Sequence, residues 1–308
     1  MQHQAFAKPG QFYKGNLHTH CTASDGALDA GEVCRRYAEA GYDFLCMSDH
    51  FVGLYNYPVT DTTGLRTNRF TTILGAEVHS GRMANGEIWH IVAAGLPLDF
   101  APSGQEDFQP NDSAETPAEL ARRCAEAGAF VAVAHPEWNG MTPEDARLIE
   151  AADAVEIYNH GCHVESDRGY GIAVWDTLLN EGWRVTACAT DDAHFRGPDF
   201  FGGWVMVKAE ANEPGALLAA LKAGEYYATT GPEIHDFRIE DGHAVIECSP
   251  AERIIAVGQC AASKYDHGTG ITRTELPLTG RFERSGWVRA AVQDTAGKRA
   301  WSNPIWFD

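Results

Sequence analysis

The sequence predicts an α/β domain with a largely parallel sheet, followed by a small antiparallel β-sandwich. From Phe12 to about Lys208, short apolar runs typical of strands alternate with stretches typical of helices. After Gly231 and Pro232 the strand-like runs alternate polar and apolar residues, are separated by turn residues and contain no helical periodicity. We therefore predict a domain boundary between residues 232 and 233.

Eight strands are predicted in the first domain. They are Leu17 to His20, Phe44 to Ser48, Thr72 to Val78, Ile88 to Ala94, Phe130 to Ala134, Ala154 to Tyr158, Val185 to Ala189 and Trp204 to Lys208. Five strands are predicted in the second domain. They are Phe237 to Ile239, Ala244 to Cys248, Ile254 to Val257, Glu275 to Leu278 and Trp287 to Val292.

Two helices of the first domain have clear boundary signals. Asp29 to Ala40 and Thr116 to Ala127 are each followed by glycine, which often ends a helix. The start Thr116-Pro117-Ala118-Glu119 combines an N-cap hydroxyl, a proline at the first helical position and an acid at the third. Two segments without periodicity, Phe51 to Arg69 and Leu96 to Glu115, are interpreted as binding loops or as mobile surface insertions.

Composition and charge exclude several classes of protein. The formal net charge is −19, which argues against a duplex nucleic-acid partner because phosphate binding needs a basic face. No apolar run approaches the roughly 18 residues of a membrane span, and the first residues lack the features of a signal peptide. Eight cysteines without a C-x-x-C pair indicate a reducing compartment. We expect a cytoplasmic protein that acts on a small molecule.

Histidines and carboxylates follow the predicted strands one after another. His18 and His20 are two residues apart, so on a strand they would share a face and could reach one metal ion together. Ligand-type residues recur along the chain at Asp25, His50, Glu77, His90, His135, Asp192 and His194. Because functional residues gather at the carboxyl ends of parallel strands, we expect these nine side chains to meet at one edge.

The chemistry of these side chains suits divalent cations. Mixed imidazole and carboxylate ligands fit Zn, Mn or Fe better than a cysteine-rich structural zinc or an all-oxygen calcium site. Nine candidates exceed the needs of one ion, so two or three ions are expected, with Glu77 as a bridging ligand. His90 could instead be a hydrogen-bonded core residue, and the sequence does not separate Asp191 from Asp192. Neither a G-x-S-x-G elbow nor a phosphate-binding loop occurs, and Cys21 beside His20 is a weaker candidate nucleophile.

Taken in order, these motifs resemble those of the PHP (polymerase and histidinol phosphatase) superfamily over roughly residues 12–232. The motifs are His18-Thr19-His20 with Ser24-Asp25-Gly26, Ser48-Asp49-His50, Gly75-Ala76-Glu77, His90, Ala134-His135-Pro136 and Asp192-Ala193-His194. Further segments look more narrowly like the stand-alone CehA/McbA-like group. They are Glu156-Ile157-Tyr158-Asn159, Trp175-Asp176, Tyr227 to Pro232 and Ala300 to Ile305.

The resemblance implies a distorted (β/α)7 barrel, similar to a TIM barrel, with a two- or three-metal site. In that arrangement His18, His20, Glu77 and Asp192 would hold one ion. Glu77, His90 and His135 would hold a second ion, and Asp25, His50 and His194 a third. The family includes phosphoesterases, whereas the narrower group includes enzymes of carbamate or amide cleavage.

The leading hypothesis is therefore a metal-dependent phosphoesterase acting on a small phosphomono- or phosphodiester, with a metal-bridging hydroxide as nucleophile. His194 or Asp25 would protonate the leaving group, and Arg168, Arg196 and His163 are candidate substrate-binding residues. The first alternative is a carbamate, amide or ester hydrolase that uses the same metals, with Phe51 to Tyr57 supplying apolar surface. The second is a non-catalytic, metal-stabilised binding protein.

Overall fold

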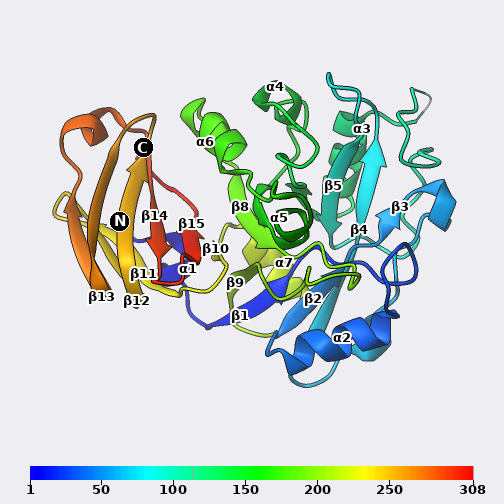
Figure 1. The fold of residues 1–308 in the computed structure, drawn as a ribbon, viewed down its shortest axis with the longest axis horizontal. Helices are drawn as coiled ribbons and strands as arrows, with labels where there is room; N and C mark the ends of the chain where they lie inside the picture. Colours follow the sequence, from blue (N-terminus) through cyan, green and yellow to red (C-terminus); the bar gives the residue numbers. More distant parts are fainter. Residues whose placement is uncertain (113, 308) are drawn as a thin grey trace.

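The structure, a computed structural model, describes residues 1–112 and 114–307 as a mixed α/β fold around one large sheet (Figure 1). The strands up to residue 232 are β1 (Gln11–Asn16), β2 (Phe44–Met47), β3 (His50–Phe51), β4 (Thr71–Ser80), β5 (Trp89–Ala94), β6 (Phe130–Val133), β7 (Ala154–Asn159), β8 (Thr186–Thr190), β9 (Trp204–Ala209) and β10 (Tyr226–Thr229). The later strands are β11 (Ile234–Glu240), β12 (His243–Gly258), β13 (Ser263–Pro277), β14 (Trp287–Gln293), β15 (Arg299–Ser302) and β16 (Ile305–Trp306). The α-helices are α1 (Gln4–Ala7), α2 (Ala30–Glu39), α3 (Pro117–Glu126), α4 (Pro143–Ala146), α5 (His160–Ser166), α6 (Ile172–Asn180) and α7 (Pro214–Lys222).

The sheet is open, so a closed barrel is not confirmed. Its strand order runs β11-β12-β14-β15-β10-β9-β1-β2-β4-β5-β6-β7-β8. Pairing is parallel from β1 through β2 to β4 and from β6 through β7 to β8. One isolated parallel bridge, between Thr19 and Ala193, joins the segment that follows β1 to the segment that follows β8. This bridge brings the two segments side by side at the edge where the parallel strands end.

Two strands predicted for the first domain, β5 and β9, are antiparallel to their neighbours, in contrast to the prediction of a largely parallel sheet. β5 is antiparallel to both β4 and β6. Its first residues therefore lie at the edge where the parallel strands have their carboxyl ends. His90, near the start of β5, pairs in register with His79 of β4. An imidazole in the middle of an apolar run thus reaches the same edge as the residues that follow the other strands.

The two sequence-predicted helices are confirmed, together with their caps. Asp29 accepts a hydrogen bond from the backbone N–H of Glu32 at the start of α2. Thr116 and Glu119 form a reciprocal capping box at the start of α3. Both helices bury one face, as their spacing of apolar residues requires. The first predicted strand is displaced: β1 ends at Asn16, so His18 and His20 lie beyond it rather than within a strand.

Apolar residues are buried on both faces of the sheet. Successive residues of β5 and β6 point to opposite sides: Ile91 and Val131 pack with Trp175 in one cluster, whereas Val92 and Phe130 pack in another. Helices α3 and α6 supply part of the first cluster through Leu120 and Leu178, among other residues. Among the described residues, no helix is long and apolar enough to cross a membrane.

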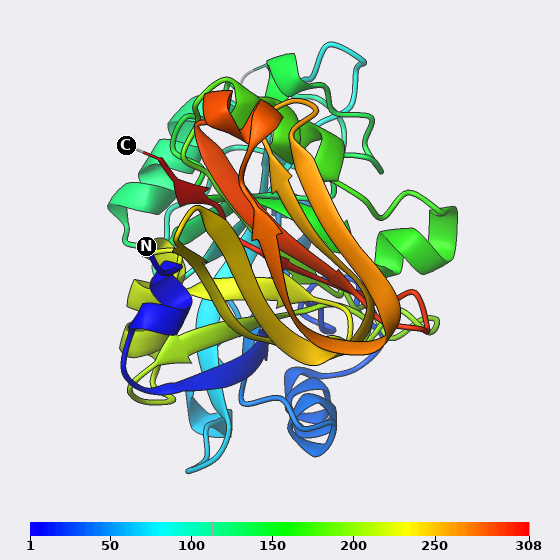
Figure 2. The ribbon, with the colours of Figure 1, turned by 90° about the vertical axis from the view of Figure 1, so that its left-hand side faces the viewer.

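The strands after residue 232 are hydrogen-bonded to the rest of the sheet, because β15 pairs with β10. Two predicted strands, 244–248 and 254–257, are parts of the single long strand β12. Its register with β13 shifts between Glu247 and Arg253, and it pairs with β11 before this irregularity and with β14 after it. Figure 2 shows the long β12 and β13 curving together across this side of the molecule.

The N-terminal residues belong spatially with these later strands. Gln2 forms a bridge with Arg238 of β11, and the N–H of Ile239 donates to the carbonyl of Met1. Figure 2 shows this first segment lying beside the C-terminal strands. The sequence assigns residues 1–3 to the first predicted domain, and in the structure they lie beside β11. The boundary between residues 232 and 233 stays a prediction.

An ion pair between a buried guanidinium and a partly exposed carboxylate connects the two parts of the chain. Arg289 of β14 is 3% exposed. Its Nε and Nη2 atoms donate hydrogen bonds to the carboxylate of Asp176 in α6, at 3.0 to 3.2 Å. We expect Asp176→Ala to lower the free energy of unfolding by about 3 kcal/mol, because it leaves a buried guanidinium unpaired. Urea denaturation would measure the change. The exposed pair of Glu144 and Arg147 supplies the control, since Glu144→Ala should change the free energy of unfolding much less; equal losses in the two variants would contradict the prediction.

Candidate metal centre

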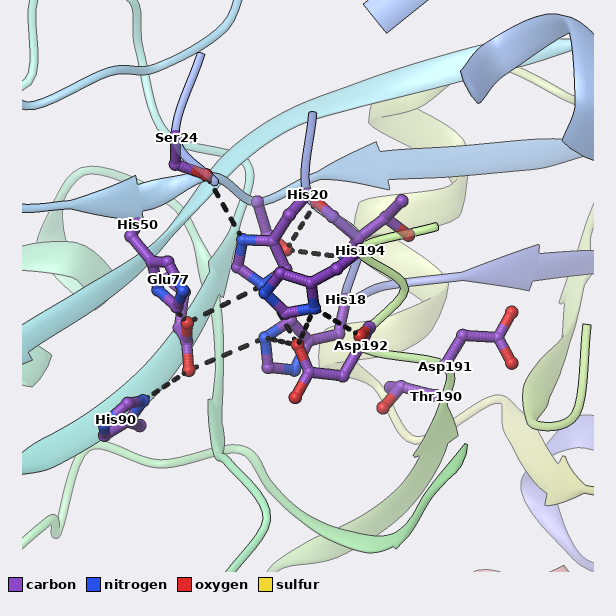
Figure 3. Close-up of polar contacts among 12 residues, drawn as sticks. His18, His20, Ser24, His50, Glu77, His90, Thr190, Asp191, Asp192 and His194 are labelled. Carbon is purple, nitrogen blue, oxygen red and sulfur yellow. Dashed lines mark hydrogen bonds and ion pairs between the residues drawn. The ribbon is translucent and has the colours of Figure 1, made fainter. Parts of the chain in front are cut away.

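The structure brings all nine predicted ligand residues together at the edge where β1, β2, β4, β6 and β8 end and β5 begins. Figure 3 shows the imidazoles of His18, His20 and His194 converging on the carboxylates of Glu77 and Asp192. Eight of these residues fall, within the described part of the chain, into four groups of candidate ligand atoms, each with atoms within 4.8 Å of one another. The groups are His18, Glu77 and His135; His18, His20 and Asp192; His20, Asp25, His50 and His194; and His50, Glu77 and His79. His90 joins them through Glu77.

Glu77 lies at the centre of the site and is fully buried. Its Oε1 atom is 2.8 Å from His90 Nδ1 and 3.1 Å from His135 Nε2. Its Oε2 atom is 2.5 Å from His50 Nδ1. Burial alone would raise the pKa of this carboxyl, but the surrounding imidazoles hold the pKa well below its usual range. Glu77 therefore offers one charged oxygen to each of two neighbouring groups of histidines, as the prediction of a bridging ligand requires.

Asp192 and Asp25 organise the remaining imidazoles. Asp192 Oδ1 is 3.2 Å from His18 Nε2 and 3.0 Å from His20 Nε2. Asp25 Oδ1 is 3.4 Å from His50 Nε2 and 3.2 Å from the Nε2 atom of His194. The two aspartates thus define two adjacent donor groups that share His20.

The fit of divalent cations to these groups follows from atoms that lack a partner. His18 Nε2, Asp25 Oδ1 and Glu77 Oε2 are buried and have no hydrogen-bond partner within the described part of the chain. Buried polar atoms are rarely left unsatisfied, and buried charges are normally paired or bound to metal. Here imidazole nitrogens face carboxylate oxygens across about 3 Å. Imidazole and carboxylate groups are the ligand types of Zn, Mn or Fe sites. The number and identity of the ions stay predictions.

The structure separates Asp191 from Asp192. Asp191 accepts hydrogen bonds from the hydroxyl of Tyr37 and from the backbone N–H groups of Phe201, Gly202 and Gly203, at 2.7 to 2.9 Å. Figure 3 shows its carboxylate pointing away from the imidazoles. Asp192 has a φ of +55°, which turns its side chain back toward them. Asp191 therefore shapes the 201–203 loop, and Asp192 faces the site.

Two site residues were missed by the sequence reasoning. Glu156 is buried in β7 and contacts His18, and His79 of β4 lies 3.0 Å from His50. Both had a signal in the sequence. Glu156 places a carboxylate inside an apolar run, and His79 follows Glu77 by two residues, which places both on one face of a strand. His79 Nδ1 also lacks a hydrogen-bond partner among the described residues.

A cavity of about 320 Å³ opens onto the site. Its apolar lining comes from Ile88, Phe108 and Trp138, and Phe108 belongs to the 96–115 segment, which therefore contributes to the cavity as predicted for a binding loop. Of the predicted substrate-binding residues, Arg196 lines the cavity, with its guanidinium 3.8 Å from Asp25.

Arg168 and His163 are not brought to this cavity. Among the described residues that line it, neither is present. The ring of His163 packs against Tyr158 and Tyr170, and Arg168 is exposed to solvent. His163 lies on α5 and Arg168 lies just beyond it. The direction of this short helix, which no local sequence pattern specifies, points both side chains away from the cavity. The cavity is instead lined from this helix by Cys162 and Glu165.

Comparison with known proteins supports the fold. No protein-family model matches the chain, and no curated protein matches it. A two-domain protein from Bacteroides vulgatus that contains a predicted PHP-like metal-dependent phosphoesterase matches with a TM-score of 0.54 and 16% identity, over 96% of this chain and 97% of that chain. An amidohydrolase from Chromobacterium violaceum matches with a TM-score of 0.44 and 14% identity, over 58% of this chain and 87% of that chain. A candidate metal-dependent phosphoesterase from Bifidobacterium adolescentis matches with a TM-score of 0.41 and 13% identity, over the same shares.

The first of these matches spans both parts of the chain and shows a PHP-like fold. The resemblance seen in the sequence motifs is therefore confirmed at the level of fold. The identity is too low to carry more than the fold, and the two weaker matches carry no argument. The narrower CehA/McbA-like grouping stays a prediction.

Metal binding should stabilise the protein through Asp192. At a free Zn²⁺ concentration of 100 times the Kd, we expect the free energy of unfolding of the metal-depleted protein to rise by about 2.7 kcal/mol. Asp192→Asn should lose most of this increase. Asp191→Asn should lower the starting stability but keep the increase, because Asp191 faces the loop; the same increase in both variants would contradict the assignment of Asp192. Denaturant titrations with and without metal give these values.

The pair of His194 and Asp25 should make the stability of the metal-free protein depend on pH. Burial lowers the pKa of His194, but the neighbouring carboxylates of Asp25 and Asp192 raise it to about 9, above the ordinary value of 6.5. Burial raises the pKa of Asp25, but His194 lowers it to about 2, below the ordinary 3.8. The contribution of His194 is therefore complete below pH 6.5 and lost as the pH rises to about 9, whereas that of Asp25 is lost as the pH falls from 3.8 to about 2.

We accordingly expect His194→Gln to destabilise the chelator-treated protein most between about pH 4 and 6.5, with the difference shrinking toward pH 9. Urea denaturation of both proteins across this range measures it, with the exposed His235→Gln as control. A difference that is constant up to pH 10 would show that the ion pair is not the cause.

Proposed function

We propose that this chain is a metal-dependent hydrolase that acts on a small phosphoester. The observation that carries the proposal is the set of overlapping donor groups, which share Glu77, His18 and His20, at the base of a solvent-accessible cavity. Structural metal sites usually enclose one ion with four ligands, whereas catalytic sites keep a position open. The number of ligands and the cavity together favour catalysis over a metal-stabilised binding protein.

The proposed ligands divide among the ions as the family resemblance implies. His18, His20, Glu77 and Asp192 would hold one ion. Glu77, His90 and His135 would hold a second, and Asp25, His50 and His194 a third. Divalent ions at these positions would lower the pKa of a bridging water, the proposed nucleophile, and would offset the negative charge of a phosphoryl group.

Besides binding metal, side chains of the site must position the substrate and supply a proton to the leaving group. Arg196 lies at the cavity next to Asp25 and offers the cation that a phosphoryl oxygen needs. His194 and Asp25 can hold a proton between them, since their side chains are 3.2 Å apart. If the site held two ions, this pair would be available to protonate the leaving group; if it held three, the pair would serve as ligands.

A carbamate, amide or ester substrate is the second candidate, and the lining of the cavity favours it. Ile88, Phe108 and Trp138 form an apolar part of the wall. Apart from histidines, Arg196 is the one basic residue among the described residues that line the cavity. Glu87 and Glu165 add negative charge to the same cavity.

The expected source of that apolar surface was wrong in part. Phe51 is fully buried against Tyr57 and Phe100, so it does not face the cavity. Tyr55 lies closer to the site, with its ring stacked at 6.3 Å from that of His50.

Turnover of three substrates distinguishes the candidates. We expect the protein loaded with Mn²⁺ or Zn²⁺ to hydrolyse p-nitrophenyl phosphate or bis-p-nitrophenyl phosphate more than a naphthyl carbamate. His18→Ala combined with His20→Ala should lower kcat/KM at least 100-fold, because these imidazoles join two donor groups. The matched control, His235→Ala with His243→Ala, removes two histidines of the C-terminal strands. Phosphatase activity that survives full chelation would refute the proposal, and clear carbamate turnover without phosphate turnover would favour the second candidate.

A further inference from the structure

We infer that Glu156, which the family resemblance does not place among the ligands, is a positioning residue that fixes the tautomer of His18 and the backbone of His135. The inference rests on the proposed metal centre. Glu156 lies in β7, behind the ring of His18 as seen from the carboxylates of Glu77 and Asp192, and it is 1% exposed. Its carboxylate has no role in the ligand groups themselves.

The carboxylate of Glu156 accepts four hydrogen bonds. Oε1 accepts from His18 Nδ1 at 2.7 Å and from the hydroxyl of Thr190 at 2.6 Å. Oε2 accepts from the backbone N–H of His135 at 2.7 Å and from Asn159 Nδ2 at 3.1 Å. Two carboxylate oxygens provide about four acceptor positions, so the group is fully used. A network with every member satisfied holds its parts rigidly.

The first consequence concerns the ring of His18. In the neutral ring that would bind metal, an Nδ1–H that donates a hydrogen bond to Glu156 places the lone pair on Nε2. Nε2 faces Asp192 Oδ1 at 3.2 Å and Glu77 Oε1 at 3.6 Å, where an ion shared by these residues would lie. A carboxylate behind a ligating histidine fixes the ring and makes it a stronger donor to metal.

The second consequence concerns two ligands from other strand ends. His135 has a φ of +25°, a conformation that residues other than glycine rarely adopt, and the hydrogen bond from its N–H to Glu156 offsets part of that strain. Asn159 donates from the same Nδ2 atom to Asp192 Oδ2 at 3.1 Å. Glu156 therefore acts on His18 directly, on His135 through its backbone and on Asp192 through Asn159.

The group of Asp25, His50 and His194 provides an internal reference. None of the hydrogen bonds of Glu156 in the described structure reaches these three side chains. A change at Glu156 should therefore weaken the ions near His18 and His135 and spare an ion held by the other group. A general loss of folding would affect both.

Glu156→Gln tests the inference with almost no change in shape. The amide must turn its NH₂ group toward one of the two sides. Toward His135 and Asn159 it would oppose two donors, so it should turn toward Thr190, whose hydroxyl can rotate to accept, and toward His18. His18 Nδ1 would then accept a hydrogen bond, which moves the ring proton to Nε2, where it blocks the metal.

We expect Glu156→Gln to lower the affinity for Zn²⁺ about 10- to 100-fold, measured by competition with a chromophoric chelator on metal-depleted protein. Thr190→Val is the first control, because it removes one hydrogen bond of the network but leaves the acceptor of His18 intact; we expect a change of less than about threefold. Asp153→Asn is the second. It also replaces a carboxylate by an amide. Asp153 lies three residues before Glu156, accepts a hydrogen bond from the backbone N–H of Val131 and does not contact a proposed ligand.

Anomalous diffraction from crystals of the Zn²⁺-loaded variant would show which ions are lost. The inference predicts loss near His18 and His135 and retention near Asp25. Unchanged affinity in Glu156→Gln, or equal loss of all ions, would overturn it. If the unmodified protein binds no Zn²⁺, the proposed metal centre itself fails, so the two failures are distinguishable.

Should Glu156→Gln not fold, NMR of the Zn²⁺-loaded unmodified protein answers the same question. The inference requires His18 to carry a slowly exchanging proton on Nδ1 and to bind metal through Nε2. Correlation of the ring nitrogens with their protons shows which nitrogen bears it. A proton on Nε2, or metal on Nδ1, would overturn the inference.

Discussion

The carboxylate of Glu77 has no exposure to solvent, and six imidazoles lie within 3.7 Å of its oxygens. They belong to His18, His20, His50, His79, His90 and His135. Moving an ionised carboxylate out of water costs several kcal/mol unless charges or hydrogen bonds compensate. Much of the surrounding structure serves this compensation, because segments distant in the sequence must bring these imidazoles to the same point.

The open sheet provides those positions. Parallel strands end at one edge, which accounts for most of the ligand residues, and the reversed strand β5 starts there, which accounts for His90. A second layer of acids then holds the edge together. Glu156 contacts ligands from the segments after β1 and β6, and Asp191 fixes the loop after β8 through three backbone N–H groups. The site therefore depends on carboxylates that would not themselves touch the ions.

The later strands enlarge this scaffold without reaching the cavity. They continue the sheet through β10 and β15, and Arg289 inserts its charge against α6 of the first part. The N-terminal residues close the arrangement by pairing with β11. Since the two parts share a sheet and this ion pair, we expect them to unfold together.

The sequence by itself determined most strands of the first part, two capped helices and the identity of nine clustered side chains, because strand periodicity, capping residues and ligand chemistry are local properties. It did not determine the direction of β5, the pairing of β10 with β15 or the opening between β8 and β1, which depend on contacts between distant segments. The choice of Asp192 over Asp191 required a backbone turn with positive φ. The position of Glu156 behind His18 joins residues 138 apart in the sequence. Such a contact is fixed only when the strands pack, and it decides which nitrogen of the ring faces the site.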